Sequence, residues 1–201
     1  MLKSEKDCRT QKSTLLMKRT LLSFLEDRPL HSVRVSELCK SCGINRATFY
    51  AHYCDIYDLV DAIENDIIAE LNEIMAVPNP PLLTSAEIAK RFFSYLYRHR
   101  TPLRLLLMTD NRLDFANRLN QILTGILKQT VYEQYEIPKG VSQKELDDVL
   151  GFVVFGHYSY YTRFIFDSAP LSEEEITNAA KLFSDLSECC LRQCFQMKSK
   201  S

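Results

Sequence analysis

Four side chains that can form hydrogen bonds with a ligand occur within seven residues. Arg46, Thr48, Tyr50 and His52 offer a guanidinium, a hydroxyl, a phenol and an imidazole, and the small Ala47 lies between the first two. A guanidinium can bind guanine through two hydrogen bonds, and hydroxyl and imidazole groups can bind phosphate oxygens. If one helix exposes these side chains together, they form a surface suited to base edges and phosphates.

The flanking sequence predicts two short helices joined by a tight turn, which would present these side chains. An apolar stripe on the first helix is formed by Val35, Leu38 and Cys39. Gly43 follows where a turn needs a positive φ, and Asn45 is a suitable N-cap for the second helix. Ile44 and Phe49 would then pack the second helix against the first. This is the helix-turn-helix pattern, although the spacing alone also fits an ordinary helical hairpin.

The composition favours a helical protein that is large enough to bury a core. Of the 201 residues, 46% are apolar, and there are only five glycines and seven prolines. The net charge is −1, so the chain as a whole is not a basic nucleic-acid binder. The charge is unevenly distributed: residues 1–60 contain ten basic and seven acidic side chains, whereas residues 61–201 contain 15 and 19. The positive excess therefore lies with the candidate helix-turn-helix.

The sequence lacks the features of several other classes of protein. No apolar run approaches the roughly 18–20 residues of a membrane-spanning helix, and the N-terminus does not have the pattern of a signal peptide. The seven cysteines fit free thiols in a reducing cytoplasm, and Cys39 and Cys42 form a CxxC pair without a second pair. We therefore interpret Cys39 as a core residue rather than a metal ligand. With no Gly-rich phosphate loop, metal-ligand cluster or nucleophile motif, we predict no enzyme, no cofactor and no metal site.

Apolar periodicity predicts the N-terminal helices. The first would run from about residue 13 to residue 27 and end before Pro29, while residues 3–12 are interpreted as a solvated terminus or a basic arm near DNA. After the two motif helices, a fourth would begin at an Asp55 cap, with Asp58 at its third position, and run to about residue 76. The segment 77–81 contains three prolines and would break the chain.

Capping boxes predict three of the five remaining helices. They read Thr84-x-x-Glu87, Ser142-x-x-Glu145 and Ser172-x-x-Glu175, and the helices would end near residues 99, 167 and 196. Two more are predicted, at 102–108 and from an Asp110 cap to about residue 136. Together these signals predict nine helices. Because no segment shows the alternation of a strand, we expect an all-α fold. We place a DNA-binding domain at residues 1–56 and an effector-binding and dimerisation domain at residues 57–201.

The stretch from Val35 to Leu59 closely resembles the DNA-binding region of the TetR family of bacterial transcriptional regulators. The family's signature is matched at Gly43, Ile44, Asn45, Thr48, Phe49, Tyr50, His52 and Tyr53. The close resemblance covers about residues 13–65, and residues 151–186 look similar to the C-terminal helices of some members from low-GC Gram-positive bacteria. The resemblance implies a cytoplasmic regulator that binds a palindromic operator as a homodimer and responds to an effector. Repression is the default expectation, because most of the family repress.

Two positions depart from the family's pattern. Arg34 stands where Thr or Ser usually caps the first motif helix, and Ile56 stands where a Lys often touches the DNA backbone. Arg34 or Lys40 would then partly replace that phosphate contact. By the resemblance, Tyr50 also reaches bases, while other side chains of the second motif helix hold the backbone. The predicted DNA-binding residues are Arg34, Lys40, Asn45, Arg46, Ala47, Thr48, Tyr50, His52 and Tyr53.

The last two long helices are predicted to form a homodimer interface. Each carries an apolar stripe, and packing the pair against a two-fold mate would give a four-helix bundle, the usual interface of the family. An alternative is that both stripes only close the core of one chain. The predicted interface residues are Phe152, Gly156, Tyr160, Phe164, Phe183, Leu186 and Cys190.

An apolar effector pocket is predicted in the C-terminal domain, where large aromatic side chains are frequent. Ligand sites in helical proteins form between helices and carry few polar groups. The predicted lining residues are Phe93, Tyr97, Leu119, Ile122, Phe155, Tyr158 and Arg163. Two alternatives stay open: an ordinary aromatic core, and a domain that senses a partner protein rather than a small apolar or aromatic molecule. His99 and His157 lie in apolar neighbourhoods and are predicted to be packed neutral histidines.

Overall fold

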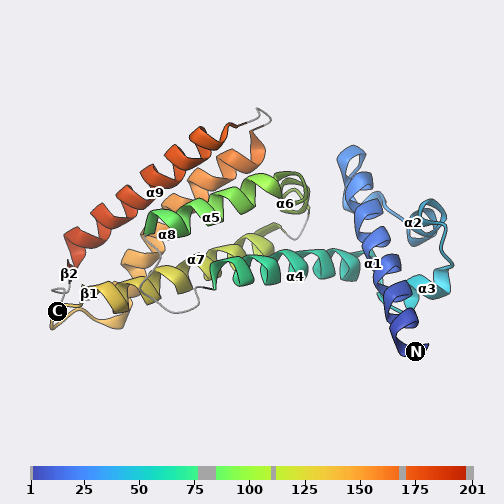
Figure 1. Ribbon diagram of the computed structural model, residues 1–201, viewed down its shortest axis with the longest axis horizontal. Coiled ribbons are helices and arrows are strands. Elements are labelled where there is room, and N and C mark those ends of the chain that lie inside the picture. The colour runs from blue at the N-terminus through green and yellow to red at the C-terminus, as the bar shows by residue number, and fades with distance from the viewer. Residues whose placement is uncertain (1, 77–84, 110–111, 168–170, 198–201) are drawn as a thin grey trace. The chain divides into compact units, whose positions relative to one another are not determined.

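The structure is a computed structural model that describes residues 2–76, 85–109, 112–167 and 171–197, with residues 2–9, 85, 112 and 197 described by their backbone alone. These residues form nine α-helices, which confirms the predicted all-α fold (Figure 1). The helices are α1 Leu2–Asp27, α2 Val35–Cys42, α3 Arg46–Tyr50, α4 Ile56–Met75, α5 Ser85–Arg98, α6 Arg100–Leu107, α7 Arg112–Gln134, α8 Gln143–Phe166 and α9 Glu173–Cys194. A 3-10 turn (η1, Leu30–Ser32) follows α1, and two short strands are β1 Tyr135–Glu136 and β2 Gln196–Met197.

The chain divides into two compact units, each with its own core. We call residues 1–69 together with 104–115 the head unit, and residues 70–103 together with 116–201 the body unit. Because α4 begins in the head unit and ends in the body unit, it is a continuous helical connection between them. None of the described helices is both long and apolar enough to cross a lipid bilayer.

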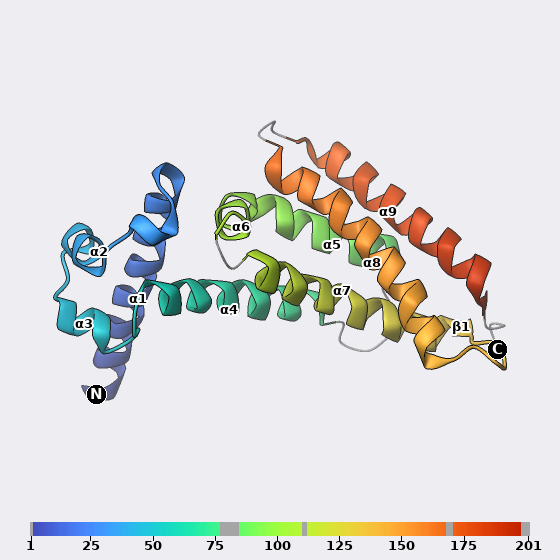
Figure 2. The ribbon, with the colours of Figure 1, turned by 180° about the vertical axis from the view of Figure 1, so that it is seen from behind.

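The head unit packs α1, α2 and α3 around a small apolar core. In both ribbon views α2 and α3 lie beside α1 (Figures 1 and 2). The core contains the fully buried side chains of Met17, Leu21, Leu38, Phe49 and Leu59. α1 and α2 each contribute several apolar side chains to it and α3 contributes Phe49, so the opposite faces of α2 and α3 are left for solvent.

The turn between α2 and α3 has the geometry that the sequence predicts. Gly43 has φ of 64°, in the left-handed region, and its N–H donates to the carbonyls of Cys39 and Lys40. Asn45 caps α3, because its side-chain oxygen accepts a hydrogen bond from the Ala47 N–H at 2.9 Å. The N-cap prediction is confirmed, and the turn fixes where α3 begins relative to α2.

Two reciprocal hydrogen bonds start α4. The Asp58 N–H donates to Asp55 Oδ1 at 2.9 Å, and the Cys54 N–H donates to Asp58 Oδ2 at 2.7 Å. The Asp55 cap is therefore confirmed. This arrangement satisfies N–H groups that have no partner within the helix and defines the direction in which α4 leaves the motif.

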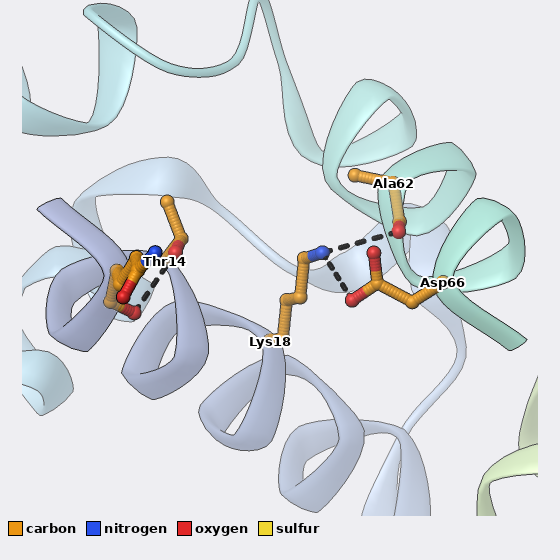
Figure 3. A network of polar contacts seen from close by, with 5 residues as sticks. Thr14, Lys18, Ala62 and Asp66 are labelled. Carbon is orange, nitrogen blue, oxygen red and sulfur yellow. Dashed lines mark hydrogen bonds and ion pairs between the residues drawn. The ribbon is translucent and has the colours of Figure 1, made fainter. Parts of the chain in front are cut away.

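An ammonium group ties α1 to α4 inside the head unit. Lys18 Nζ donates to Asp66 Oδ2 at 2.6 Å and to the Ala62 carbonyl at 3.1 Å (Figure 3). The Lys18 side chain is only 17% exposed, whereas that of Asp66 is 56% exposed, so solvent screens the ion pair in part. The contact links the first helix of the head to the helix that continues into the body.

Replacing Lys18 with methionine should lower the free energy of unfolding by about 1 kcal/mol, because an ion pair and a hydrogen bond to a carbonyl are both lost. Urea unfolding measures the change. Lys12→Met, at an exposed position of the same helix, is the control and should stay within about 0.5 kcal/mol of wild type. Equal stability of the Lys18 variant and the control would show that the contact contributes nothing.

In the body unit α5 packs against α8 and α9, and the three helices lie side by side in both views (Figures 1 and 2). The Phe93 ring makes edge-to-face contacts with Phe164 and Phe183, at 5.2 and 5.0 Å between ring centroids. Two of the three predicted capping boxes lie among the described residues and are present: the Ser142 and Ser172 N–H groups each donate to a glutamate three residues on, at 2.7 Å. These signals define the starts of α8 and α9.

Four features differ from the sequence predictions or lie outside the described residues. α1 begins at Leu2 rather than near residue 13, because residues 2–12 contain no glycine or proline and continue the helix. α6 begins two residues earlier than predicted, since Pro102 is tolerated in a first turn, where no N–H is needed. The proline segment and the Thr84 and Asp110 caps lie outside the described residues.

The fourth difference is the pair of strands. β1 and β2 pair antiparallel, with Tyr135 opposite Met197 and Glu136 opposite Gln196. Next to them lies a buried apolar cluster of Val131, Tyr135, Leu146, Leu150, Leu191 and Phe195. Each strand has only two residues, which is too short for an alternating pattern, so periodicity could not have revealed it.

Candidate nucleic-acid interface

The short helix α3 buries one side chain and exposes most of the others. The Phe49 side chain is fully buried and holds the helix against the head core. Arg46 and Ala47 in the first turn are exposed, and the Tyr50 side chain is 58% exposed. The Phe49 and Tyr50 rings make an edge-to-face contact with 5.4 Å between their centroids, so the exposed Tyr50 ring packs against a buried side chain. The helix therefore presents a guanidinium and a phenol from a rigid support.

Around α3 the remaining predicted residues differ in exposure. Lys40, at the last turn of α2, is exposed, and Thr48 and His52 are half-buried. Tyr53 is buried, with its ring 5.7 Å from Phe49, and burial together with the nearby carboxylates of Asp66 and Asp58 raises its pKa. Tyr53 is thus a neutral core side chain, the one member of the predicted DNA-binding set that the head buries.

Arg34 precedes α2 and is exposed. Its side chain makes no capping hydrogen bond, but its N–H donates to the Glu37 carboxylate at 3.4 Å, and Glu37 also pairs with Arg28 at 3.2 Å. Glutamate at the third position of α2 thus forms one half of a capping box by accepting from the Arg34 N–H, and the guanidinium of Arg34 is left at the surface.

The CxxC pair belongs to the head core. The Cys39 and Cys42 side chains are both buried, and burial raises the pKa of the Cys39 thiol. The described residues contain no group of three or more His, Cys, Asp and Glu side chains that could hold a metal ion.

A groove runs along the exposed faces of α8 and α9. It has a volume of about 260 Å³ and is almost entirely apolar. Its rim is formed by Phe152, which is 76% exposed, Leu186, 57%, and Leu182, 48%. Its lining residues are Phe152, Val153, Gly156, His157, Tyr160, Leu182, Phe183, Leu186, Ser187 and Cys190. Six of the seven predicted interface residues line it, and the seventh, Phe164, packs against Phe93 instead.

An inner cavity of about 60 Å³ lies between α5, α7, α8 and α9. Its walls are mostly aliphatic and aromatic, and its polar side chains come mainly from α8 and α9. The lining residues are Met75, Ile88, Ala89, Phe92, Leu123, Ile126, Leu127, Thr130, Tyr135, His157, Phe183, Ser184, Ser187, Glu188 and Leu191. His157, Phe183 and Ser187 line both the cavity and the groove, so they form the wall between them.

The chain is similar to known proteins in structure but not in sequence. No protein-family model and no curated protein matches the chain. Among solved structures, a TetR transcriptional regulator from Streptococcus agalactiae is 16% identical, covers 92% of this chain and 98% of its own, and superposes with a TM-score of 0.66. The dihydroxyacetone kinase operon activator DhaS is 16% identical, with 92% of this chain and 98% of its own covered, and has a TM-score of 0.59. FadR from Bacillus subtilis, in complex with stearoyl-CoA, is 15% identical, with 86% of this chain and 96% of its own covered, and has a TM-score of 0.57.

The chain has the TetR-family fold. The likeness spans nearly the full length of each neighbour, so it covers both the helix-turn-helix unit and the body. At identities of 15–16%, the comparison establishes the arrangement of the helices and leaves the chemistry to the residues of this chain.

Within this TetR-like body, none of the seven predicted pocket residues lines the inner cavity. Phe93 and Leu119 are buried elsewhere in the core, Ile122 is half-buried, and Phe155 is 71% exposed. The other three have different places: the Tyr97 hydroxyl accepts a hydrogen bond from the Leu171 N–H at 2.8 Å, Tyr158 contacts Tyr161 edge to face, and Arg163 is exposed.

His157 is the functional candidate that sequence reasoning did not assign to the pocket. It is buried, and its ring stacks on Phe183 at 3.5 Å between centroids. Its Nε2 lies 2.7 Å from Ser187 Oγ. Burial lowers the pKa of His157 to about 4, so the ring is neutral at pH 7. The apolar residues around His157 in the sequence predicted a packed, neutral side chain, but they did not predict that it lines a cavity.

The buried neutral histidine predicts acid sensitivity. Because its pKa is about 4 in the fold and about 6.5 when unfolded, the unfolded chain binds more protons between these values. Stability should fall as pH drops from about 6.5 towards 4, by about 3 kcal/mol for this group. Urea unfolding across that range checks it: the stability of His157→Phe should depend less steeply on pH than that of the wild type. Parallel curves for His157→Phe and wild type would contradict the assignment.

Proposed function

We propose that this protein is a sequence-specific DNA-binding transcriptional regulator that acts as a repressor. The observation that carries the proposal is α3: Gly43 and Asn45 set its start, Phe49 anchors it, and its first turn exposes Arg46. In helix-turn-helix proteins the second helix enters the major groove with its N-terminal residues on base edges. We assign DNA binding to residues 1–56, and effector binding and dimerisation to residues 57–201.

The side chains divide by the contact that their exposure allows. Arg46 is assigned to a guanine edge, and Tyr50 to a neighbouring base. Thr48 on α3 and His52 just after it are half-buried and are assigned to phosphates, and so are the exposed cations Arg34 and Lys40. Tyr53 keeps its place in the set as a positioning residue, because its buried ring packs on Phe49 rather than facing solvent.

The groove on α8 and α9 supports a homodimer. It is unfavourable to leave this apolar groove in contact with water, since its large side chains Phe152, Leu182 and Leu186 are exposed. A second copy related by a two-fold axis would bury the same groove on both chains and bring two heads to two half-sites. We therefore propose a palindromic operator whose half-sites lie about 34 Å apart or a multiple of that distance.

The inner cavity supports an effector site in the body. FadR of the same fold is described in complex with stearoyl-CoA, which is a large ligand. The cavity here is about 60 Å³, far below the roughly 300–1,000 Å³ of drug-sized sites. We propose a small effector that shifts the balance between two arrangements of the protein by binding one of them more tightly.

Selection of bound duplexes from random DNA by the full-length chain tests the proposal. We expect enrichment of an inverted repeat whose half-site centres are separated by about 10–10.5 base pairs or a multiple of it. Enrichment of a single half-site would contradict the proposal that the protein binds DNA as a homodimer. Recovery of no sequence above the random background would remove sequence-specific DNA binding.

A further inference from the structure

A further cavity lies in the head unit, between the end of α1 and the end of α6. Its volume is about 340 Å³, and we call it the α1–α6 cavity. The volume falls in the range of roughly 300–1,000 Å³ that is typical of sites for small organic molecules. None of its lining residues lines the inner cavity of the body unit. The lining residues are Leu25, Glu26, Asp27, Arg28, Pro29, Leu30, Leu105, Met108 and Thr109.

One part of the α1–α6 cavity is apolar. Leu30 is 5% exposed and Leu105 is 7% exposed, so the chain itself already covers most of both side chains. Met108, in contrast, is 67% exposed although it is large and apolar. An apolar group bound in the cavity would remove part of Met108 from water and pack against the two leucines, which is favourable.

The end of α1 brings negative charge to the other part of the cavity. Glu26 and Asp27 lie in the last turn of α1 and are exposed, and neither carboxylate has a hydrogen bond or ion pair within the described residues. Carboxylates are unfavourable at this end of a helix, because the helix dipole is negative there, and the last turn of α1 has no basic side chain to offset them. Departures from such local rules are expected where a protein binds a ligand.

The neighbouring residues do not compensate this charge. Pro29 has no N–H, so the Leu25 carbonyl lacks the donor that a continuing helix would provide. The Arg28 guanidinium pairs with Glu37 at 3.2 Å and lies over the Phe24 ring at 4.4 Å, and both of these partners are outside the cavity lining. A ligand at this end of the cavity should therefore carry positive charge and N–H donors.

We propose that the α1–α6 cavity binds a small organic cation, a primary amine attached to an apolar group, with about 8–12 non-hydrogen atoms in total. Its ammonium group donates to the carboxylates of Glu26 and Asp27, and its apolar group packs against Leu30, Leu105 and Met108. The size follows from the volume, which is more than twice the roughly 150 Å³ that accommodates benzene in an apolar protein cavity. Because this site differs from the effector cavity of the body unit, the inference does not depend on the proposed function.

Three probes of similar size separate recognition of charge from filling of the cavity. Phenethylamine is a cation at neutral pH, phenethyl alcohol is its uncharged counterpart, and phenylacetate is an anion. Titration of the full-length protein with each probe, followed by methyl NMR of the methionines, measures both affinity and location. We expect a shift at Met108 and none at Met17, which is fully buried in the head core and does not line the cavity.

The affinities of the probes should follow their charge. At low salt the amine should bind about threefold or more tighter than the alcohol, because exposed ion pairs contribute modestly, and phenylacetate should bind more weakly than either. Raising the salt concentration should reduce the preference for the amine, because mobile ions screen exposed charges.

Two double variants identify the carboxylates. Glu26→Gln with Asp27→Asn removes both charges and keeps the shape of the side chains, so the preference for the amine should disappear while the alcohol binds as it does to wild type. Glu173→Gln with Glu174→Gln is the matched control, since it neutralises an adjacent exposed pair in the first turn of α9, outside the cavity. The control should bind all three probes like wild type.

The outcomes separate this inference from the proposed function. Equal affinity of wild type for the amine and the alcohol, or a preference that survives in Glu26→Gln with Asp27→Asn, would overturn the site even if the protein binds an operator. Binding that leaves Met108 unshifted would also overturn it. A preference for the amine that only this variant loses, with the shift at Met108, would support the site even if no operator is found.

Discussion

Replacing Arg46 with alanine should abolish the preference for one base pair in each half-site of the operator. A two-pronged arginine–guanine contact contributes about 1–3 kcal/mol of discrimination, and alanine offers no donor to replace it. The first-turn position and exposure of Arg46 make it the residue of α3 best placed for this contact. Binding titrations with operator duplexes that carry each base at the position in turn measure the change.

Two further variants show whether the effect is one of base reading or of charge. His52→Ala should weaken binding to all duplexes about equally, because a phosphate contact carries no sequence information. Arg19→Ala removes the same charge from an exposed site on α1 and should leave the base preference intact. If Arg46→Ala retained the wild-type preference at every base pair, the assignment of α3 as the reading helix would be wrong.

Placing glutamates at both Phe152 and Leu186 should convert the protein to a monomer at micromolar concentration. Both side chains are more than half exposed in the single chain, so the substitutions should spare its core, whereas in a dimer they would put like charges in a buried apolar groove. Operator affinity should fall by about 100-fold or more, because the second head is no longer held near its half-site. Light scattering and operator titration measure the two effects.

Leu113→Glu is the matched control, since Leu113 is 73% exposed on α7 and outside the groove. It should remain dimeric and bind the operator like wild type. A double variant that stayed dimeric, or a wild type that was already a monomer, would show that the groove is not the interface. Phe164 and Phe183 are poorer positions for this test, because both pack against Phe93 and charge there would disturb the monomer.

The features that the sequence predicted well are set by a few neighbouring residues. Asn45 caps α3, and Ser142 and Ser172 cap α8 and α9, because each capping hydrogen bond forms between residues two or three apart. The positive φ of Gly43 has the same local origin. These signals define where helices start and which faces they expose, and thus the exposed set on α3.

The features that the sequence did not predict depend on how distant helices pack. Phe155 and His157 are two residues apart on α8, yet the first is exposed and the second lines the cavity. Which of them faces inward is set by the rotation of α8 against α5 and α9, and the apolar sequence around both positions conceals it. Tyr53 is similar, since its buried side chain lies near Asp66 on α4, thirteen residues further along the chain. Strands of two residues carry no periodic signal at all.

Sequence-specific recognition of DNA is tested most directly by comparing the affinity of the protein for a selected operator with its affinity for a scrambled duplex of the same composition, at several salt concentrations. We expect the operator to bind at least about 1,000-fold more tightly than the scrambled duplex at physiological salt. The logarithm of each affinity should fall linearly with the logarithm of salt concentration, because bound phosphates release counterions. Equal affinity for the two duplexes, or no measurable binding of either, would contradict it.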